Sequence, residues 1–302
     1  MFFKIMTTSI CACAAAILLA HALPAGAKTA EDQLGREIRM PDDPQRIVAL
    51  APSITEIIFA LGQQKRLKGV TQYSNYPPEA AKLPKVGSYV RLDLERIVAL
   101  NPDLCVAIKD GNPKEIIDRL QSLDIAVFAV NPHDLESMMQ AIQKIGDVLN
   151  ASQNAKTLVS DMRSRIKKID DLVSRAERRP RVFIQIGIFP IISGGTHTFI
   201  NELIVRAGGV NVAAGPSAYP HFSREQVLAL APDVLIITSM AGSGAYEKAR
   251  ADWSRFSDMP AIREKRIYTV NSDVFDRPSP RFQDALEILT RLLHPELFKE
   301  GP

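Results

Sequence analysis

The stretch ERIVALNPD at residues 95–103 occurs a second time in this chain, as EQVLALAPD at residues 225–233. Five of the nine positions are identical, two more exchange one aliphatic residue for another, and the offset is 130 residues throughout. The repetition indicates that the chain contains two similar halves. The surrounding sequence shows what kind of structure each half forms.

The first copy reads as a short helix followed by a strand. Asp93 can cap a helix over residues 94–100, and Pro102 stops it. Residues 104–108 are then apolar without interruption, which is typical of a short strand buried on both faces. This segment therefore predicts a helix that leads into a strand of a parallel sheet.

The second copy gives the same prediction with a stronger start signal. Ser223 can cap the helix, and Gln226, three residues later, completes a capping box. Pro232 stops this helix, and residues 234–238 form the second apolar run. Both halves thus place a helix and a buried strand in the same order.

The elements before and after each copy repeat more loosely. In both halves an apolar run is followed by a turn with proline and then by a helix that glycine closes. Strands that alternate with helices favour two α/β lobes with mainly parallel sheets. The further strands predicted are 46–50, 68–71, 126–130, 181–186 and 266–270, and the further helices are 54–61 and 199–206.

One long amphipathic helix is predicted between the lobes, over residues 152–179, with Pro180 ending it. At 1.5 Å per residue its length would be about 40 Å. The same spacing allows a coiled-coil dimer seam, but both flanks continue directly into α/β pattern, which favours a strut packed along both lobes of a monomer. Its apolar stripe consists of Ala155, Val159, Met162, Ile166, Ile169, Val173 and Ala176.

The first 27 residues are typical of an export signal rather than of the folded protein. Lys4 precedes an apolar run, and a small-x-small pattern ends at Ala27, where cleavage is expected. A membrane anchor would need about 20 apolar residues, more than this run has. Cys11 and Cys13 lie inside the run, not just after it, so a lipoprotein signal is not expected. The organisation predicted is a signal at 1–27, an N-terminal extension at 28–45, an N-terminal lobe at 46–151, the interlobe helix at 152–179 and a C-terminal lobe at 180–302.

Composition excludes several classes of protein. With 46% hydrophobic and 24% charged residues, the 302-residue chain can bury a substantial core. Its net charge of +3, which becomes +2 without Lys4, is not typical of a nucleic-acid-binding protein. After the signal only Cys105 remains, so no internal disulfide can form, and a small buried residue is the better interpretation.

Aromatic residues gather in the loops that are predicted to follow strands. In open α/β sheets a ligand is held by such loops, in the crevice at the carboxyl ends of the strands. Aromatic faces there could bury a large planar ligand, and hydroxyl groups could bind its polar rim. The alternative is that each aromatic merely seals its own loop onto its lobe. The residues concerned are Tyr73, Tyr89, Phe189, Tyr219, His221 and Phe275.

Two similar lobes joined by one helix behind an export signal resemble the class III periplasmic substrate-binding proteins of ABC importers, which have a single helical hinge. The motifs that carry the resemblance are Arg46–Ser53 with Glu56, Gly69–Thr71, Leu94–Leu104 and Ser223–Asp233. The resemblance covers essentially the whole chain after the signal. It implies a periplasmic protein that is not an enzyme, that closes only slightly on its ligand, and that delivers the ligand to a membrane permease dimer.

Within this class the chain is most similar to the periplasmic cobalamin-binding proteins. The loop Tyr73–Ala80, with its double proline, is typical of them, and Val182–Gly187 and Ser272–Arg281 match their second lobe. The resemblance implies cobalamin or a related corrinoid as ligand. It places Tyr73, Tyr89 and Tyr219 along the corrin and makes Asp273 and Arg277 polar contacts. Such proteins often have tryptophan at two of these positions, whereas the only tryptophan here, Trp253, lies elsewhere.

Glu95 and Glu225 occupy equivalent positions in the first turn of the two copied helices. The resemblance implies that they dock onto arginines of the two permease subunits, one from each lobe. A matched pair suits a two-fold partner. The alternative for either residue alone is that an acid near a helix N-terminus stabilises the helix by about 0.3–1 kcal/mol without any partner.

Three other functions have less support in the sequence. A haem or ferric-siderophore receptor of the same class remains open, with His221 as a candidate axial ligand to iron. A dedicated metal carrier is not expected, because the four histidines after the signal, His133, His197, His221 and His294, lack the i, i+4 spacing of a helical zinc pair. An extracytoplasmic hydrolase would need a nucleophile motif, which the glycine-rich stretches 193–195 and 242–244 do not match.

Overall fold

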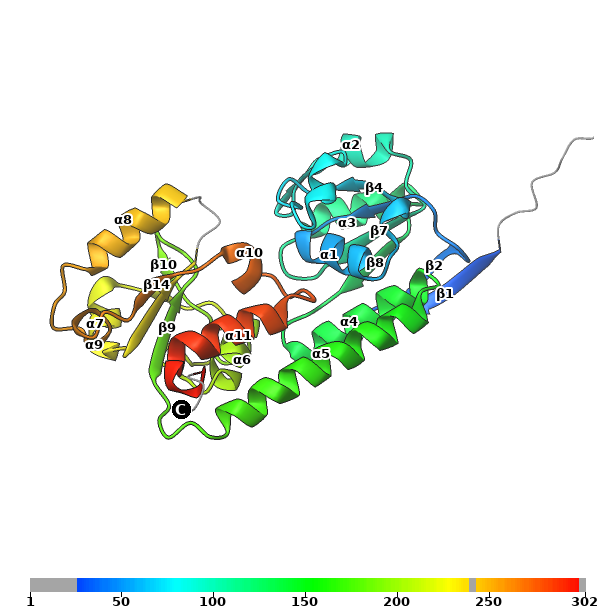
Figure 1. Cartoon of the computed structure of the whole chain (residues 1–302). Helices are drawn as coiled ribbons and strands as arrows, with labels where there is room; N and C mark the ends of the chain where they lie inside the picture. Colours follow the sequence, from blue (N-terminus) through cyan, green and yellow to red (C-terminus); the bar gives the residue numbers. More distant parts are fainter. Residues whose placement is uncertain (1–25, 239–242, 299–302) are drawn as a thin grey trace, which may run out of the picture.

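The structure is a computed structural model that describes residues 26–238 and 243–298. Two α/β lobes stand on one long helix, α5 (Ser152–Val173), which runs beneath both of them (Figure 1). Each lobe contains one four-stranded parallel sheet. The predicted fold class is therefore confirmed.

In the N-terminal lobe the strand order is β4-β3-β7-β8, and every pair is parallel. Ile47 and Val106 face a core shared with α5, whereas Val48 and Cys105 face a second core closed by α2 and α3. Because both faces are covered, these strands are uninterrupted apolar runs. The elements are β3 (Ile47–Ala49), α1 (Pro52–Ala60), β4 (Leu67–Val70), α2 (Leu94–Ala99), β7 (Leu104–Ile108), α3 (Lys114–Ser122), β8 (Val127–Val130) and α4 (Leu135–Val148).

The C-terminal lobe repeats this topology. Its strand order is β11-β9-β13-β14, again parallel, so both sheets have their second strand outermost, next to the first. Val182 and Val234 face the core shared with α5, while Phe183 and Leu235 face a core closed by α7, α8 and α9. The elements are β9 (Arg181–Gln185), α6 (Phe199–Arg206), β11 (Val210–Asn211), α7 (Arg224–Leu230), β13 (Val234–Ile237), α8 (Ser243–Trp253), α9 (Pro260–Arg263), β14 (Ile267–Thr269), α10 (Ser272–Phe275) and α11 (Phe282–Leu293).

The repeated segment has the structure that the sequence predicts. The Asp93 side chain accepts a hydrogen bond from the backbone N–H of Arg96 at the start of α2. At the start of α7, Ser223 and Gln226 form both bonds of a capping box. Each helix leads into β7 or β13, the third strand of its sheet in chain order. The repeat therefore builds equivalent parts of the two lobes.

Helix α5 packs against α4 of the N-terminal lobe and α11 of the C-terminal lobe. Its apolar stripe is buried within the chain from Ala155 to Val173, so this stripe is not free to form a dimer seam. The prediction that the helix reaches Pro180 is wrong, because α5 ends at Val173. Beyond this point the apolar stripe has only Ala176, which lies among charged residues. In addition, Arg179 precedes Pro180, and a residue before proline disfavours the helical conformation.

The N-terminal extension forms a hairpin that the sequence did not predict. Strands β1 (Ala27–Glu31) and β2 (Glu37–Pro41) pair antiparallel, and the backbone N–H of Gln33 bonds to the carbonyl of Ala129 at 3.1 Å. Residues 1–25 of the predicted signal lie outside the described residues. Smaller elements are η1 (Gln64–Arg66), η2 (Pro78–Lys82), β5 (Gly87–Ser88), β6 (Arg91–Leu92), β10 (Ile191–Ile192), β12 (His221–Phe222) and η3 (Pro295–Phe298).

Cys105 is fully buried in β7, as its apolar surroundings predict. Burial raises the pKa of its thiol to about 12, so the thiol stays protonated and unreactive. Within residues 26–238 and 243–298, none of the helices has the length and apolar character needed to span a bilayer.

Candidate functional site

A cavity of about 500 Å³ lies between the two lobes. Much of its wall comes from loops after parallel strands: Ala51–Ser53 after β3, Asp110 and Gly111 after β7, and Asn131–His133 after β8. Ile186 and Gly187, after β9, face them from the other lobe. Open α/β sheets bind ligands at this edge, and ligand pockets have volumes of about 300–1,000 Å³. The cavity therefore has the place and size of a ligand site.

Tyr89 belongs to the N-terminal wall of the cavity, in the turn between β5 and β6. The side chain of Asn112 holds this turn, because its Nδ2 donates to the carbonyls of Tyr89 at 2.9 Å and Leu50 at 2.8 Å. Gly111, with a φ of +123°, lies against the ring: a Cβ there would be 2.8 Å from Tyr89 Cδ2. Asn112 and Gly111 thus fix where Tyr89 stands.

Tyr219 belongs to the opposite wall, just before β12. The carbonyl of its neighbour Ala218 accepts a hydrogen bond from the backbone N–H of Gly195 at 2.8 Å, which ties this segment to the loop after β10. Tyr219 is 51% exposed although it lines the cavity, so it stands at the mouth. One tyrosine from each lobe therefore borders the cavity.

The hydroxyl groups of Tyr89 and Tyr219 are uncharged at physiological pH. Burial raises the pKa of Tyr89, and the charge of Asp276 adds to this effect. Burial also raises the pKa of Tyr219, with further contributions from Asp110 and Asp276. A neutral phenol can donate one hydrogen bond and accept others. The hydroxyl groups of Tyr89 and Tyr219 can therefore bind both hydrogen-bond donors and hydrogen-bond acceptors of a ligand.

Asp276 lines the cavity from the C-terminal lobe, at the end of α10. Its two carboxyl oxygens accept hydrogen bonds from the hydroxyl of Thr238, at 2.8 and 2.7 Å. Burial raises the pKa of Asp276 to about 7, although the Thr238 bond and the charge of Arg277 act in the opposite direction. This carboxyl group therefore changes its charge near neutral pH.

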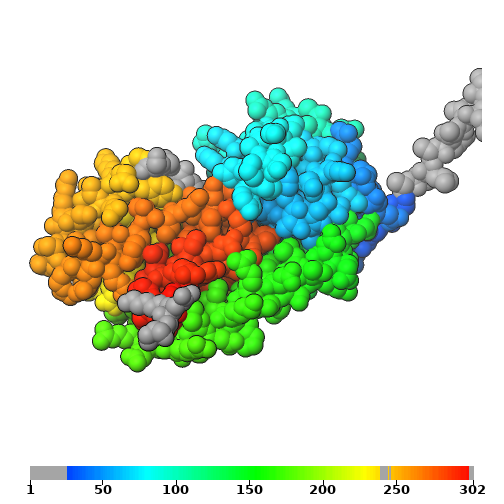
Figure 2. Space-filling view, viewed as in Figure 1, coloured from blue at the N-terminus to red at the C-terminus, as the bar shows by residue number. Residues whose placement is uncertain are grey.

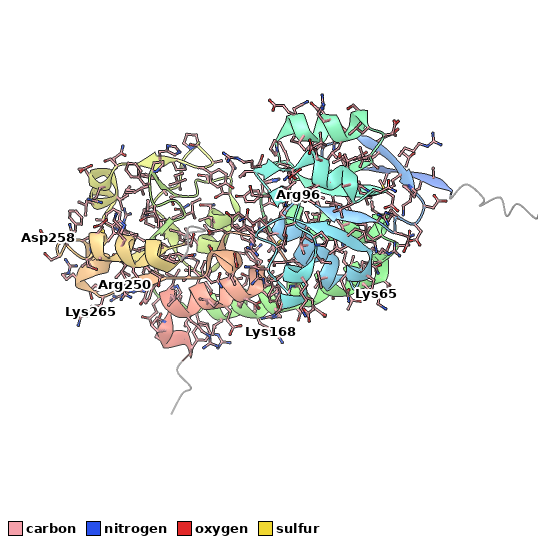
Figure 3. All side chains as sticks on the ribbon, turned by 90° about the horizontal axis from the view of Figure 1, so that it is seen from above. Lys65, Arg96, Lys168, Arg250, Asp258 and Lys265 are labelled. Carbon is pink, nitrogen blue, oxygen red and sulfur yellow. The ribbon has the colours of Figure 1, made fainter. Side chains whose placement is uncertain are left out.

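Beside the cavity a buried ionic network joins the lobes. The carboxylate of Glu56, in α1, accepts hydrogen bonds from Arg277 at 3.1 Å and from Arg281 at 2.6 and 2.8 Å. The side chains of Glu56 and Arg277 are only 2% and 7% exposed. Figure 2 shows the orange and red C-terminal segment in contact with the blue N-terminal lobe above α5. Seen from above, the C-terminal segment again lies beside the N-terminal lobe (Figure 3).

The double-proline loop joins the same network. Arg277 donates to the carbonyl of Tyr73 and to Oδ1 of Asn75, both at 2.9 Å. The guanidinium of Arg281 stacks 4.1 Å from the ring centre of Tyr76. Asp273 accepts from Arg277 and, at 2.6 Å, from Nδ2 of Asn75. We call this set, Glu56, Asp273, Arg277 and Arg281 with the loop Tyr73–Tyr76, the interlobe network.

The structure brings only part of the predicted binding residues together. Tyr89, Tyr219 and Arg277 line the cavity, and the hydrogen bonds of Arg277 go to the interlobe network. Tyr73, His221 and Asp273 are not among the lining residues. Tyr73 is nevertheless near enough to Tyr89 to contribute to its raised pKa.

Two further aromatic residues from the sequence analysis differ sharply in environment. Phe275 is 1% exposed and belongs to the core shared with α5, so it seals its loop as the alternative interpretation predicts. Phe189 is 98% exposed at the turn after β9. Trp253 is buried and donates a hydrogen bond to Gln185 at 2.7 Å.

The sequence analysis did not predict four ionisable residues of the cavity wall, which are Asp110, Asp276, His133 and His197. Asp110 and His133 follow predicted strands closely, so the rule that selects loops after strands could have found them. Asp276 ends a short helix, and His197 precedes α6, so no strand pattern marks either residue. Among the residues that the structure describes, no cluster of three or more His, Cys, Asp or Glu side chains is arranged to hold a metal ion.

Glu95 and Glu225 are both exposed in the first turn of their helices. Helices α2 and α7 lie on the sides of their lobes that face away from α5 (Figure 1). A backbone hydrogen bond and the Ser223 hydroxyl hold the pKa of Glu225 below its usual value, so this side chain is charged. The two glutamates thus lie exposed at equivalent positions of the two lobes.

Two parallel-sheet lobes, one bridging helix and a ligand-sized cavity between the lobes define a class III periplasmic substrate-binding protein of an ABC importer. The sequence comparison agrees, since the family model described as "Periplasmic binding protein" matches residues 47–274. The chain belongs to the periplasmic binding protein family.

Individual relatives differ in their named ligands. The vitamin B12-binding protein of Photorhabdus laumondii is 31% identical over 252 residues, which cover 83% of this chain and 88% of that protein. Among solved structures, the vitamin B12-binding protein BtuF of Vibrio cholerae has a TM-score of 0.75 and 28% identity, with 86% and 100% of the two chains covered. The haem-binding protein RhuT of Roseiflexus sp. RS-1 has a TM-score of 0.77 and 29% identity, with 84% and 99% covered. All three are binding proteins, which supports a role in binding rather than catalysis.

Proposed function

We propose that this protein binds cobalamin or a related corrinoid in the interlobe cavity and delivers it to the permease of an ABC importer. The observation that carries the proposal is the cavity itself, with Tyr89 and Tyr219 on opposite walls. Two aromatic faces suit a flat macrocycle, and neutral hydroxyl groups suit a rim of amides, which both donate and accept hydrogen bonds. The relatives named as vitamin B12-binding proteins support the same ligand.

Haem is the second candidate, because the cavity wall contains two imidazoles, His133 and His197. Imidazole is a common axial ligand of haem iron. These two side chains, rather than His221, are the ones to test, since His221 is not among the lining residues. A haem-binding relative of similar fold supports this alternative.

Calorimetric titration of residues 28–302 with cyanocobalamin, dicyanocobinamide and haemin tests the proposed ligand. We expect one-to-one binding of the two corrinoids and weak or absent binding of haemin. Binding of haemin alone would contradict the proposal and favour the second candidate. In that case His133→Ala and His197→Ala would be the first variants to compare, with His221→Ala as their control.

We further propose that Glu95 and Glu225 dock the loaded protein onto the two permease subunits, and that the exported protein acts as a monomer. Both carboxylates are exposed, and they occupy equivalent positions in the two lobes. The double variant Glu95→Lys/Glu225→Lys should abolish uptake of the ligand by cells but leave its affinity unchanged. Glu115→Lys, which changes an exposed acid in the first turn of α3, is the matched control. Uptake that survives the double charge reversal would contradict the docking role.

A further inference from the structure

Two carboxyl groups that the sequence analysis did not name as site residues face the cavity from opposite lobes. Asp110 follows β7 in the N-terminal lobe, and Asp276 ends α10 in the C-terminal lobe. Both contribute to the raised pKa of Tyr219, so both lie near its hydroxyl. Each lobe therefore supplies one tyrosine and one aspartate to the same part of the wall.

In the described part of the cavity wall, no free fixed cation balances these carboxyl groups. Arg277 is the only arginine or lysine that lines it within residues 26–238 and 243–298. Its guanidinium is engaged by Glu56, Asp273, Asn75 and the carbonyl of Tyr73. The remaining ionisable groups of the wall are the two tyrosines and the two histidines. The fixed charge open to a ligand is therefore negative.

The two carboxyl groups also have unused capacity to accept hydrogen bonds. Within the part of the chain that the structure describes, Asp276 accepts a side-chain hydrogen bond only from the Thr238 hydroxyl, and Asp110 has no hydrogen bond or ion pair. An ionised carboxyl group has about four lone-pair sites. A ligand that brings N–H donors to this wall would satisfy them. A ligand that brings carboxylates would meet like charges without a cation between them, which is costly in a partly desolvated site.

We propose that Asp110 and Asp276 set the ligand class of this cavity, by accepting hydrogen bonds from an uncharged, amide-rimmed macrocycle and repelling a carboxylate-rimmed one. This inference rests on the proposed function and adds the residues that distinguish a corrinoid from a haem. The carboxylates of haem are the feature that this wall disfavours.

The test compares the affinities for cyanocobalamin and haemin in the wild type, in Asp110→Asn, in Asp276→Asn and in the double variant. Asparagine keeps the size and one oxygen acceptor but removes the charge. We expect the preference for cyanocobalamin over haemin to fall by about tenfold for each substitution and by more in the double variant. Asp118→Asn, on the outer surface of α3 where Asp118 pairs with Lys114, is the control and should change nothing.

Salt and pH give two further readouts. Added salt should reduce the preference in the wild type but not in the double variant, because it screens charge repulsion. The preference in the wild type should also be weaker at a pH below about 7, where Asp276 becomes protonated, than above it. Asp276→Asn should lack the part of this pH dependence that Asp276 causes.

The outcomes separate the inference from the proposed function. If the wild type binds cyanocobalamin but the double variant keeps the same preference over haemin, the inference is wrong and the proposed function stands. If the wild type binds haemin only, or neither compound, the proposed function fails and the inference fails with it. A melting curve would reveal whether Asp276→Asn folds poorly. In that case Asp110→Asn alone tests the inference, because Asp110 is exposed and its substitution leaves the core intact.

Discussion

The two lobes meet in two contrasting ways. In the interlobe network, Glu56 is paired with Arg277 and Arg281, and these groups are nearly inaccessible to solvent. A short way along the same interface, Tyr89, Tyr219 and Asp110 line a cavity, and their side chains form no hydrogen bond with the residues that the structure describes. The first region fixes how the lobes stand relative to each other, and the second leaves a gap of defined shape. In this interface, side chains that bond to each other thus hold the lobes together, whereas side chains that line the cavity are available to a ligand.

The largest effect should come from breaking the interlobe network. Glu56→Ala leaves Arg277 and Arg281 buried without their carboxylate, and removal of one partner of a buried ion pair costs about 3–5 kcal/mol. Urea unfolding should show this loss. In the control Glu136→Ala, which removes an exposed pair with Arg163, the loss should be about 0–1 kcal/mol. Equal losses in the two variants would mean that the network does not hold the lobes together.

The next effect should appear in binding and not in stability. Tyr89→Ala removes an aromatic face from the cavity wall and should weaken ligand binding by about 10- to 100-fold, equivalent to about 1.4–2.7 kcal/mol. Calorimetry measures this change. Tyr76→Ala is the contrasting variant, because Tyr76 stacks on Arg281 in the interlobe network. It should cost about 0.5–1 kcal/mol of stability and leave affinity intact. If Tyr76→Ala lowered the affinity and Tyr89→Ala lowered only the stability, the roles assigned to the network and to the cavity would be wrong.

A smaller effect should follow from disturbing the support of Tyr89. In Gly111→Ala the new methyl group would collide with the Tyr89 ring, at a backbone position with positive φ. Strain of this kind costs about 1–3 kcal/mol, and a displaced ring should lower ligand affinity by about three- to tenfold. Gly215→Ala is the control, since a Cβ there meets nothing within 4 Å. Unchanged affinity in Gly111→Ala would show that the position of the Tyr89 ring is unimportant for binding.

The smallest effect concerns pH. The pKa of Asp276 rises from 3.8 to about 7 in the folded protein, so the folded state holds this proton more tightly than the unfolded state. The free energy of unfolding therefore falls as the pH increases from about 4 to about 7. Asp276→Asn should lack this decrease and should melt at a higher temperature than the wild type above pH 7, by about 2–4 °C for each kcal/mol of the decrease, with little difference near pH 4. If the wild type melted at a higher temperature than Asp276→Asn at alkaline pH, the predicted direction of the effect would be wrong.

The sequence predicts most of the fold because its signals are local. The caps at Asp93 and Ser223 and the apolar runs at 104–108 and 234–238 specify their own conformation, and the duplication repeats them. The end of α5 was predicted less well. Proline gives only an outer limit for a helix, and the loss of an apolar partner ends it earlier.

The site was predicted less completely, because it depends on which distant segments meet. Tyr89 and Tyr219 were found from loops after strands, but the buried partner of Arg277 is Glu56, which lies 221 residues away. No pattern within either segment reveals this contact. The double-proline loop likewise looked like part of a ligand site, whereas several of its groups bind Arg277 and Arg281.

The central claim is that the unsatisfied cavity, and not the interlobe network, receives the ligand. Hydrogen exchange of the protein with and without cyanocobalamin tests it most directly. We predict that the ligand protects the amides around Tyr89, Asp110 and Tyr219, and leaves the hairpin β1–β2 unchanged as an internal control. Unchanged exchange around both tyrosines, in a protein that binds cyanocobalamin, would contradict the account.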